Sequence, residues 1–296
     1  MGCVSSSAPS PRRSRRVRLA AALAVLLALV GYVAAQYATG GKSGRRCAVT
    51  ADGQRYELTP EQAGNAAVIS AVGTTRGLPE RAVAIALATA LQESGLRNIE
   101  HGDRDSLGLF QQRPSQGWGT QRQIMDPVFS AGKFYEHLAE VPGYSRLPLT
   151  VAAQRVQRSG FPQAYAKHEP DATLLAAALT GRPDTSLTCE TLGDATAGDP
   201  ARVRSELARS FGAGVLAEPR RGASGAPAGG RITLPVTGED AERRGRQLAR
   251  WAVANAEGLH LSEVSFGNRT WRAAQSSRGW VEGPDKGPGV RLEVAR

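Results

Sequence analysis

A nearly continuous run of apolar side chains between Val83 and Leu91 limits the possible folds of this 296-residue chain more than any other feature. The run opens after Pro79-Glu80 and closes at Gly95, a residue type that commonly ends a helix because it adopts left-handed backbone angles without strain. A helix that is apolar on every side is buried on every side. The sequence therefore predicts a central buried helix against which other small-residue helices pack.

One carboxylate, Glu93, falls in the last turn of this predicted helix. The C-terminal end of a helix carries partial negative charge, and apolar surroundings disfavour any charge. Both effects favour the protonated carboxyl near neutral pH, which is the form that acid catalysis at an ether oxygen requires. On spacing alone, a solvated carboxylate at a helix end is the commoner explanation.

The segment that follows changes this balance. Residues 100–106 are polar and rich in turn formers, and Gly108-Leu109-Phe110 then returns the chain to the core, with Gln111 and Gln112 directly after it. Neutral amides offer donors and acceptors without charge, and they suit sugar hydroxyls and N-acetyl groups. An acid beside such amides indicates a site that cleaves a glycosidic bond.

Glu93-Ser94 followed by Gly108-Leu109-Phe110-Gln111 resembles the Glu-Ser … Gly-Leu-Met-Gln signature of lysozyme-like lytic transglycosylases, and Gly102-Asp103-Arg104 is similar to a segment of goose-type lysozymes. The resemblance extends from about Thr59 to Thr180. It implies a lysozyme-like helical fold in which Glu93 is the catalytic acid and no metal or organic cofactor takes part. The side chains that it places on the substrate are Ser94, Asp103, Gln111, Gln112 and Tyr165.

Three departures from the family pattern bear on the mechanism. Phe110 replaces the usual methionine, and Gln112-Arg113 stands where goose-type enzymes carry a second aspartate. The family's later tyrosine segment is not present, and Tyr165 is the nearest candidate for its tyrosine. A route with one glutamate therefore fits better than hydrolysis by two carboxylates, for which Asp103 or Asp105 would be needed.

The N-terminal segment predicts a membrane anchor. Five arginines between positions 12 and 18 precede an uncharged run from Leu19 to Ala38, which is long enough to span a bilayer. Arginines on the cytoplasmic side place everything after the span outside the cytoplasm. We expect a cytoplasmic tail (1–18), an anchor in the plasma membrane (19–38) and extracytoplasmic domains. A cleaved signal peptide, and hence a secreted protein, is the alternative, because Val33-Ala34-Ala35 has the small-residue pattern of a cleavage site.

Two cysteines, Cys47 and Cys189, lie beyond the predicted anchor, one at each end of a candidate domain. In an oxidising compartment, such a pair favours a disulfide that closes the domain. The four histidines are scattered, and no spacing of Cys and His indicates a metal site.

The formal net charge of +10 raises the question of nucleic-acid binding. Residues 1–46 carry eight basic and no acidic side chains, whereas residues 47–190 hold slightly more acidic than basic ones. The excess positive charge therefore belongs mostly to the tail and the membrane flank, and no nucleic-acid partner is expected.

The predicted fold class is mainly α: a lysozyme-like helical domain after an N-terminal transmembrane helix, followed by a small α/β domain. A short linker (39–46) leads to the helical domain (47–190). A second linker rich in Pro and Gly (191–230) leads to the accessory domain (231–296), which we infer from strand, helix and hairpin patterns.

The expected function is cleavage of the bond between N-acetylmuramic acid and N-acetylglucosamine in peptidoglycan, by a lytic transglycosylase or lysozyme-type enzyme with Glu93 as general acid and base. Two alternatives stay open. One is a non-catalytic wall-binding or scaffolding membrane protein on the same frame. The other is a protein that binds anionic lipid or nucleic acid through its basic residues 1–46.

Overall fold

The computed structural model describes residues 45–159, 163–191, 196–216, 230–284, 287 and 289–296. Residues 45–296 belong to one compact unit, which includes both the predicted helical domain and the predicted accessory domain. The predicted cytoplasmic tail and anchor, with most of the first linker, lie outside the described residues.

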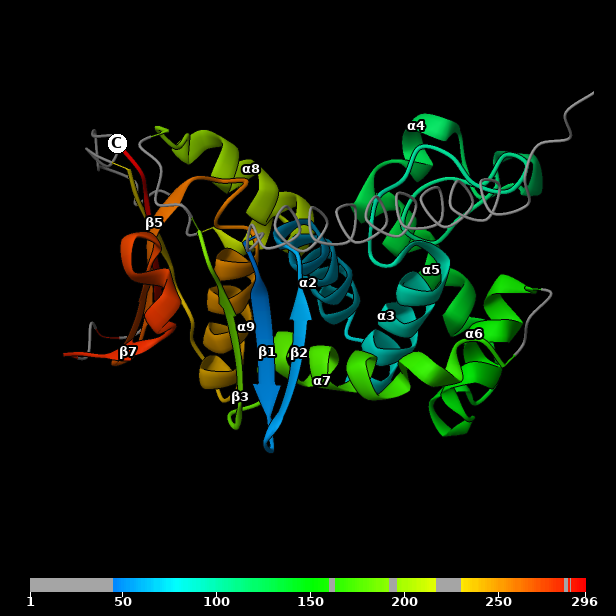
Figure 1. Cartoon of the computed structure of the whole chain (residues 1–296), viewed down its shortest axis with the longest axis horizontal. Helices are drawn as coiled ribbons and strands as arrows, with labels where there is room; N and C mark the ends of the chain where they lie inside the picture. Colours follow the sequence, from blue (N-terminus) through cyan, green and yellow to red (C-terminus); the bar gives the residue numbers. More distant parts are fainter. Residues whose placement is uncertain (1–44, 160–162, 192–195, 217–229, 285–286, 288) are drawn as a thin grey trace, which may run out of the picture. The chain divides into compact units, whose positions relative to one another are not determined.

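Helices make up most of the regular structure in the described residues (Figure 1). The α-helices are α2 (Pro60–Thr75), α3 (Glu80–Ser94), α4 (Gln121–Ile124), α5 (Pro127–Ala139), α6 (Leu149–Gln157), α7 (Glu169–Leu179), α8 (Pro200–Phe211) and α9 (Ala241–Ala254). Short 3₁₀ helices occupy Pro114–Gln116, Tyr144–Arg146, Ala166–His168, Ala213–Val215 and Ala273–Arg278.

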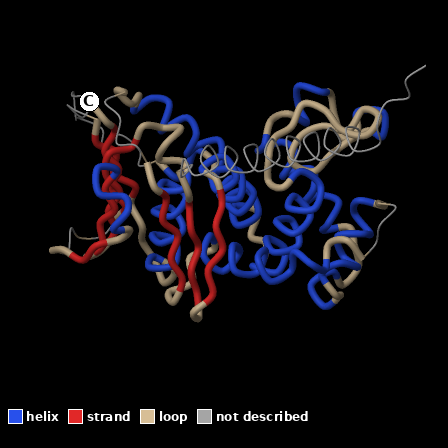
Figure 2. The backbone as a smooth tube through the Cα atoms, viewed as in Figure 1, coloured by secondary structure: helices blue, strands red, loops and turns tan. Residues whose placement is uncertain are grey.

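The strands form two antiparallel sheets, which are drawn in red in Figure 2. The first sheet has the order β2-β1-β3, and its strands are β1 (Cys47–Ala51), β2 (Gln54–Leu58) and β3 (Thr185–Cys189). The second has the order β4-β8-β5-β6-β7. Its strands are β4 (Arg231–Leu234), β5 (Leu261–Phe266), β6 (Arg269–Arg272), β7 (Val281–Glu282) and β8 (Val290–Val294).

The two central helices begin and end at the residues that local chemistry favours. At the start of α2, the Thr59 side chain accepts a hydrogen bond from the backbone of Gln62, and the Gln62 side chain accepts one from the backbone of Thr59. This reciprocal capping box satisfies amide groups that have no partner within the helix. Helix α3 ends where Gly95 takes left-handed angles, with φ of 63°. The end of α3 at Gly95 confirms the prediction from the sequence.

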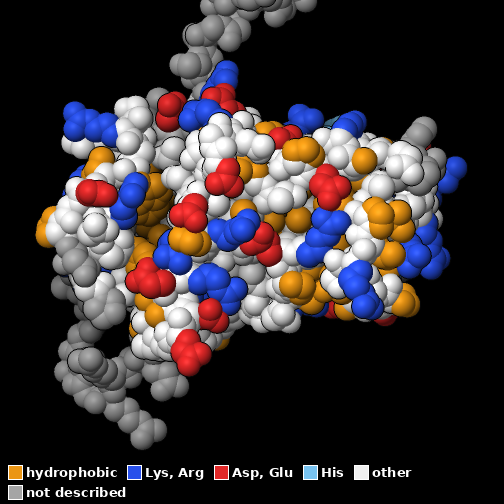
Figure 3. All heavy atoms as spheres, turned by 90° about the horizontal axis from the view of Figure 1, so that it is seen from below, with side chains coloured by type: hydrophobic (Ala, Val, Ile, Leu, Met, Phe, Trp, Pro, Cys, Tyr) orange, Lys and Arg blue, Asp and Glu red, His pale blue; other side chains and the backbone are white. Residues whose placement is uncertain are grey.

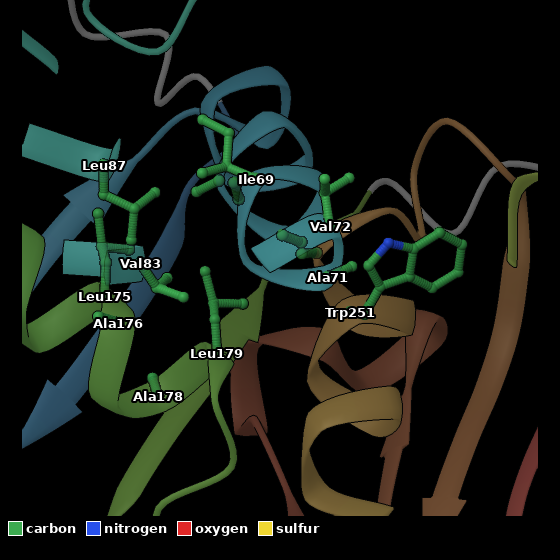
Figure 4. Packing of buried hydrophobic residues seen from close by; sticks show 14 of the residues in the cluster. Ile69, Ala71, Val72, Val83, Leu87, Leu175, Ala176, Ala178, Leu179 and Trp251 are labelled. Carbon is green, nitrogen blue, oxygen red and sulfur yellow. The ribbon is translucent and has the colours of Figure 1, made fainter. Parts of the chain in front are cut away.

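The hydrophobic core lies where α2, α3, α7 and α9 meet (Figure 4). From Val83 to Leu91, every side chain of α3 is buried, as the apolar run predicts. Many core side chains are alanines, so the helix backbones approach closely, and larger residues such as Leu87 and Leu175 fill the remaining space. Close packing of this kind fixes the position of the last turn of α3.

The first sheet closes the chain between its two cysteines. Cys47 on β1 pairs in register with Cys189 on β3, and a disulfide joins them. The predicted disulfide is therefore confirmed. It clamps together two strands that are 142 residues apart in sequence.

Helix α9 lies between the two sheets, and it contacts β3 and α2 as well as β5. The strand, helix and hairpin patterns in residues 231–296 are confirmed: β5 and β6 form a hairpin in which Phe266 pairs with Arg269, and β8 pairs with β5. Helix α8 lies within residues 191–230, which were predicted to be a linker.

The predicted fold class is wrong in its mainly α character. The described residues contain two antiparallel sheets, and the first of them belongs to the segment that was predicted to be helical. Strands β1 and β2 form a local hairpin across the two-residue turn Asp52-Gly53. Strand β3 has five residues, and it is held by pairing with the distant β1 rather than by local preference.

The predicted single-pass membrane protein is corrected as well. In the part of the chain that the structure describes, no helix is both long and apolar enough to cross a membrane. The longest described helix, α2, has 16 residues, whereas a spanning helix needs about 20. The segment 19–38 lies outside the described residues. The structure therefore gives no support to a transmembrane anchor or to localisation in the cell membrane.

Candidate functional site

Glu93 occupies the last turn of α3 with its side chain half-buried. The hydroxyl of Tyr165 donates a hydrogen bond of 2.7 Å to Glu93 Oε1. The other carboxylate oxygen, Oε2, accepts no hydrogen bond from the described residues. One oxygen is therefore held in place, and the other is available to a ligand.

Tyr165 is fully buried just before the 3₁₀ helix Ala166–His168, which packs against α3 and leads directly into α7. Burial raises the pKa of Tyr165, and the negative charge of Glu93 raises it further. The phenol therefore stays protonated at every physiological pH and acts as a permanent hydrogen-bond donor to the carboxylate.

Ser94 anchors the segment 108–112, which is called the strip below. Its hydroxyl is buried and lies within hydrogen-bonding distance of the carbonyl oxygen of Ala90 (3.1 Å), one turn back, and of Leu109 (2.8 Å). The Gln157 side chain at the end of α6 donates to the next carbonyl, that of Phe110, at 2.8 Å. Two side chains thus fix residues 109 and 110 beside the end of α3. Ser94 serves as a positioning residue, since its hydroxyl is occupied by the protein.

The two glutamines of the strip point to different places. Gln112 is 2% exposed and donates to the carbonyl of Ser130 at 3.0 Å. Its amide therefore belongs to the interior and is not open to a substrate. Gln111 is half-buried, with φ of 47°, and donates to the carbonyl of Gly108. A Cβ on Gly102 would lie 1.8 Å from Gln111 Oε1, so glycine at 102 leaves room for this amide.

The two aspartates differ in the same way. The Asp103 side chain is 91% exposed and lies 3.9 Å from Arg104 Nε. Asp105 accepts hydrogen bonds of 2.8 Å from Arg113 Nε and from the backbone of Ser115. These two donors hold the pKa of Asp105 well below its usual range. Asp105 is therefore locked in an ion pair, and Asp103 faces solvent.

The sequence did not predict a contact of Gln92, the residue before Glu93, with His168. His168 Nε2 lies 3.2 Å from Gln92 Oε1. Burial, followed by the positive charge of Lys167, lowers the pKa of His168, which favours the neutral ring as a donor to the amide. No local motif marks His168, because only the packing of 166–168 against α3 brings it there.

A groove of about 610 Å³ has Gln157 in its wall. Its walls include the rings of Trp118 and His137, whose centroids are 4.4 Å apart, and the side chains of Arg155 and Arg158. Gln157 lines this groove and also holds Phe110, so the groove adjoins the strip that follows Glu93.

No known protein-family model matches this chain, and no curated protein is significantly similar to it. The resemblance to lytic transglycosylases therefore has no support from relatives. In the described residues, no three His, Cys, Asp or Glu side chains come together as ligands of a metal ion would.

Proposed function

We propose that this protein cleaves glycosidic bonds in an N-acetylated glycan, namely peptidoglycan, with Glu93 as the single general acid and base. The hydrogen bond between Tyr165 and Glu93 is the observation that carries the proposal. A carboxyl that is held by a buried phenol through one oxygen, and open at the other, is suited to donate a proton in a fixed direction.

The chemistry begins with proton transfer from Glu93 to the oxygen between the two sugars as the bond from that oxygen to C1 breaks. Positive charge develops at C1 and at the ring oxygen. The acetamide carbonyl of the same sugar stabilises this charge, as in other glycosidases that use assistance from the substrate.

The ionised Glu93 then takes a proton from the 6-hydroxyl of that sugar, and the 6-oxygen forms a bond to C1. One proton has left Glu93 and one has returned, so the carboxyl is ready for another cycle. The departing sugar carries the first proton as its new hydroxyl group.

The surrounding carboxylates favour this route over one with two carboxylates. Asp105 is fixed by Arg113 and Ser115, and Asp103 is open to solvent with Arg104 as its one ion-pair partner among the described residues. Among the described residues, neither aspartate has a hydrogen bond to Glu93. A positioned base for an attacking water is therefore not part of the proposed mechanism.

Digestion of purified peptidoglycan sacculi by the full chain tests the proposal. We expect soluble fragments whose terminal sugars are 1,6-anhydro forms, which mass spectrometry distinguishes from reducing ends by one water. Fragments with reducing ends would instead show that water, rather than the 6-hydroxyl, attacks C1. Binding to sacculi without release of fragments would instead support the non-catalytic wall-binding alternative.

A further inference from the structure

A second cavity, of about 370 Å³, lies between the two sheets and shares no lining residue with the Glu93 site. Its walls come from the β1–β2 turn, the start of β3, helix α9 and the β5–β6 hairpin. The face of the molecule shown in Figure 3 is hollowed toward one end, with charged side chains around the hollow. A volume of this size is in the range of sites for small molecules.

Arg250 on α9 is the unusual member of this cavity, because it is 6% exposed and has no carboxylate partner among the described residues. Its Nη1 donates to the carbonyl oxygens of Ala178 and Arg182 and to the Thr185 hydroxyl, at 2.7, 2.9 and 2.7 Å, and its Nη2 donates to the Thr185 carbonyl. Neutral acceptors orient the guanidinium but do not cancel its charge.

Two further arginines line the same cavity. Arg246 pairs with Glu242, while Arg269 is exposed and donates a hydrogen bond of 3.5 Å to the carbonyl of Trp280. Burial lowers the pKa of Arg250 to about 10, and the positive charges of Arg246 and Arg269 act in the same direction. Among the described residues, no carboxylate forms an ion pair with Arg250 or with Arg269, so these two guanidinium groups are the candidates for binding an anion.

The other lining residues limit the kind of anion. Two carboxylates, Asp52 and Asp184, line the cavity beside its three arginines, and a third, Glu242, pairs with Arg246 from outside the lining. A monocarboxylate adds less repulsion with Asp52 and Asp184 than a phosphate dianion does. Ala249, Phe266 and Trp280 add apolar surface for the remainder of the ligand.

We propose that this cavity binds a small monocarboxylate that carries an apolar group, with Arg250 and Arg269 on the carboxylate and Phe266 and Trp280 against the apolar part. The planar fork of an arginine matches a carboxylate through two parallel hydrogen bonds. The two Nη1 hydrogens of the buried Arg250 already serve three acceptors and one Nη2 hydrogen serves a fourth, so its Nε–H and the second Nη2–H are left for the ligand. The exposed Arg269 provides a second set of donors that can move onto the ligand.

Calorimetric titration of the full chain with N-acetylphenylalanine tests this proposal, with its uncharged amide and inorganic phosphate as comparison probes. We expect the carboxylate to bind, and the amide and phosphate to bind at least tenfold more weakly, since a charge-assisted hydrogen bond contributes about one factor of ten or more. Equal binding of carboxylate and amide, or no binding of the carboxylate, would overturn the proposal. Preference for phosphate would assign the site to a different anion.

Variants locate the site. Arg269→Ala should weaken binding about tenfold, whereas Arg243→Ala, at an exposed position of α9 outside the cavity, should leave it unchanged. Asp184→Asn removes a negative charge from the lining and should strengthen binding of the anion. Weaker binding by Asp184→Asn, or unchanged binding by Arg269→Ala, would contradict the proposal. Arg250→Lys should also weaken binding, but because Arg250 supports the fold, the exposed Arg269 carries the test. Release of glycan fragments is measured separately, so either function can fail without the other.

Discussion

Tyr165 and Glu93 are 72 residues apart in sequence, and the phenol of the first donates a 2.7 Å hydrogen bond to the carboxylate of the second. The bond joins the segment before α7 to the last turn of α3, whose other side chains are mostly buried. It is the contact that turns an ordinary helix-end carboxylate into an oriented one.

Removal of this hydrogen bond should reduce turnover. We expect Tyr165→Phe to lower kcat by roughly tenfold to a hundredfold, because a hydrogen bond to a charged group contributes about 1.5–3 kcal/mol. The Michaelis constant should change little, since Tyr165 is buried and contacts the acid rather than the glycan. Kinetics on solubilised glycan strands measure both constants. Tyr144→Phe is the matched control, and wild-type turnover by Tyr165→Phe would remove the positioning role.

Loss of the Ser94 hydroxyl should destabilise the strip. Ser94→Ala leaves the carbonyl of Leu109 without its donor in a buried place, at a cost of about 1–3 kcal/mol in the free energy of unfolding. Urea denaturation measures this change. Ser205→Ala, at an exposed position in α8, should have no such effect. A variant at 94 as stable as the wild type would show that the strip is held by other contacts.

The ion pair of Asp105 should give stability that depends on pH. Because the folded-state pKa of Asp105 is lowered, its contribution is fully present above the pKa of the unfolded chain, near 3.9, and is lost as the pH falls below that value. Wild type should therefore be more stable than Asp105→Asn at neutral pH, with the difference shrinking below about pH 4. Asp103→Asn, at a side chain that is 91% exposed, should show no comparable difference. Chemical denaturation of the three proteins from neutral pH to below about pH 4 measures these differences in the free energy of unfolding. Equal stability of the wild type and Asp105→Asn at neutral pH would contradict the prediction.

The disulfide should contribute strongly to stability. In the chain-entropy description, a bridge across 142 residues contributes roughly 5 kcal/mol by restricting the unfolded chain. We expect the double variant Cys47→Ala, Cys189→Ala to unfold at a lower temperature than the wild type. Reductant should lower the Tm of the wild type toward that of the double variant and leave the variant unchanged. An equal Tm for both proteins would argue against this contribution.

The sequence specifies local features of this chain well. The apolar interior of α3 and its end at Gly95 depend on neighbouring residues, and both are in the structure as expected. The cysteine pair was predictable for another reason: beyond the segment predicted to span the membrane, only Cys47 and Cys189 remained to pair.

Features that depend on distant parts of the chain were not predictable in the same way. Strand β3 is short, and it pairs with β1, which lies far from it in the sequence. The burial of Gln112 depends on the carbonyl of Ser130, and the position of His168 depends on packing against α3. The sequence could not show which of the two adjacent glutamines faces inward. Their directions depend on the left-handed backbone of Gln111, where φ is 47°.

The cavity around Arg250 had no signal in the sequence. Its lining residues come from five separate segments between Thr50 and Trp280, and an arginine in an amphipathic helix is ordinarily solvated. Only the packing of α9 between the two sheets places this guanidinium inside.

Release of soluble fragments from purified sacculi by Glu93→Gln, compared with the wild type and with Glu100→Gln at an exposed position, tests the central claim most directly. Glutamine keeps the size of the side chain and can still accept from Tyr165, but it has no acidic proton to give. The wild type and Glu100→Gln should release fragments, and Glu93→Gln should release none while still binding sacculi. Equal release by Glu93→Gln, or no release by the wild type, would contradict the assignment of Glu93 as the acid.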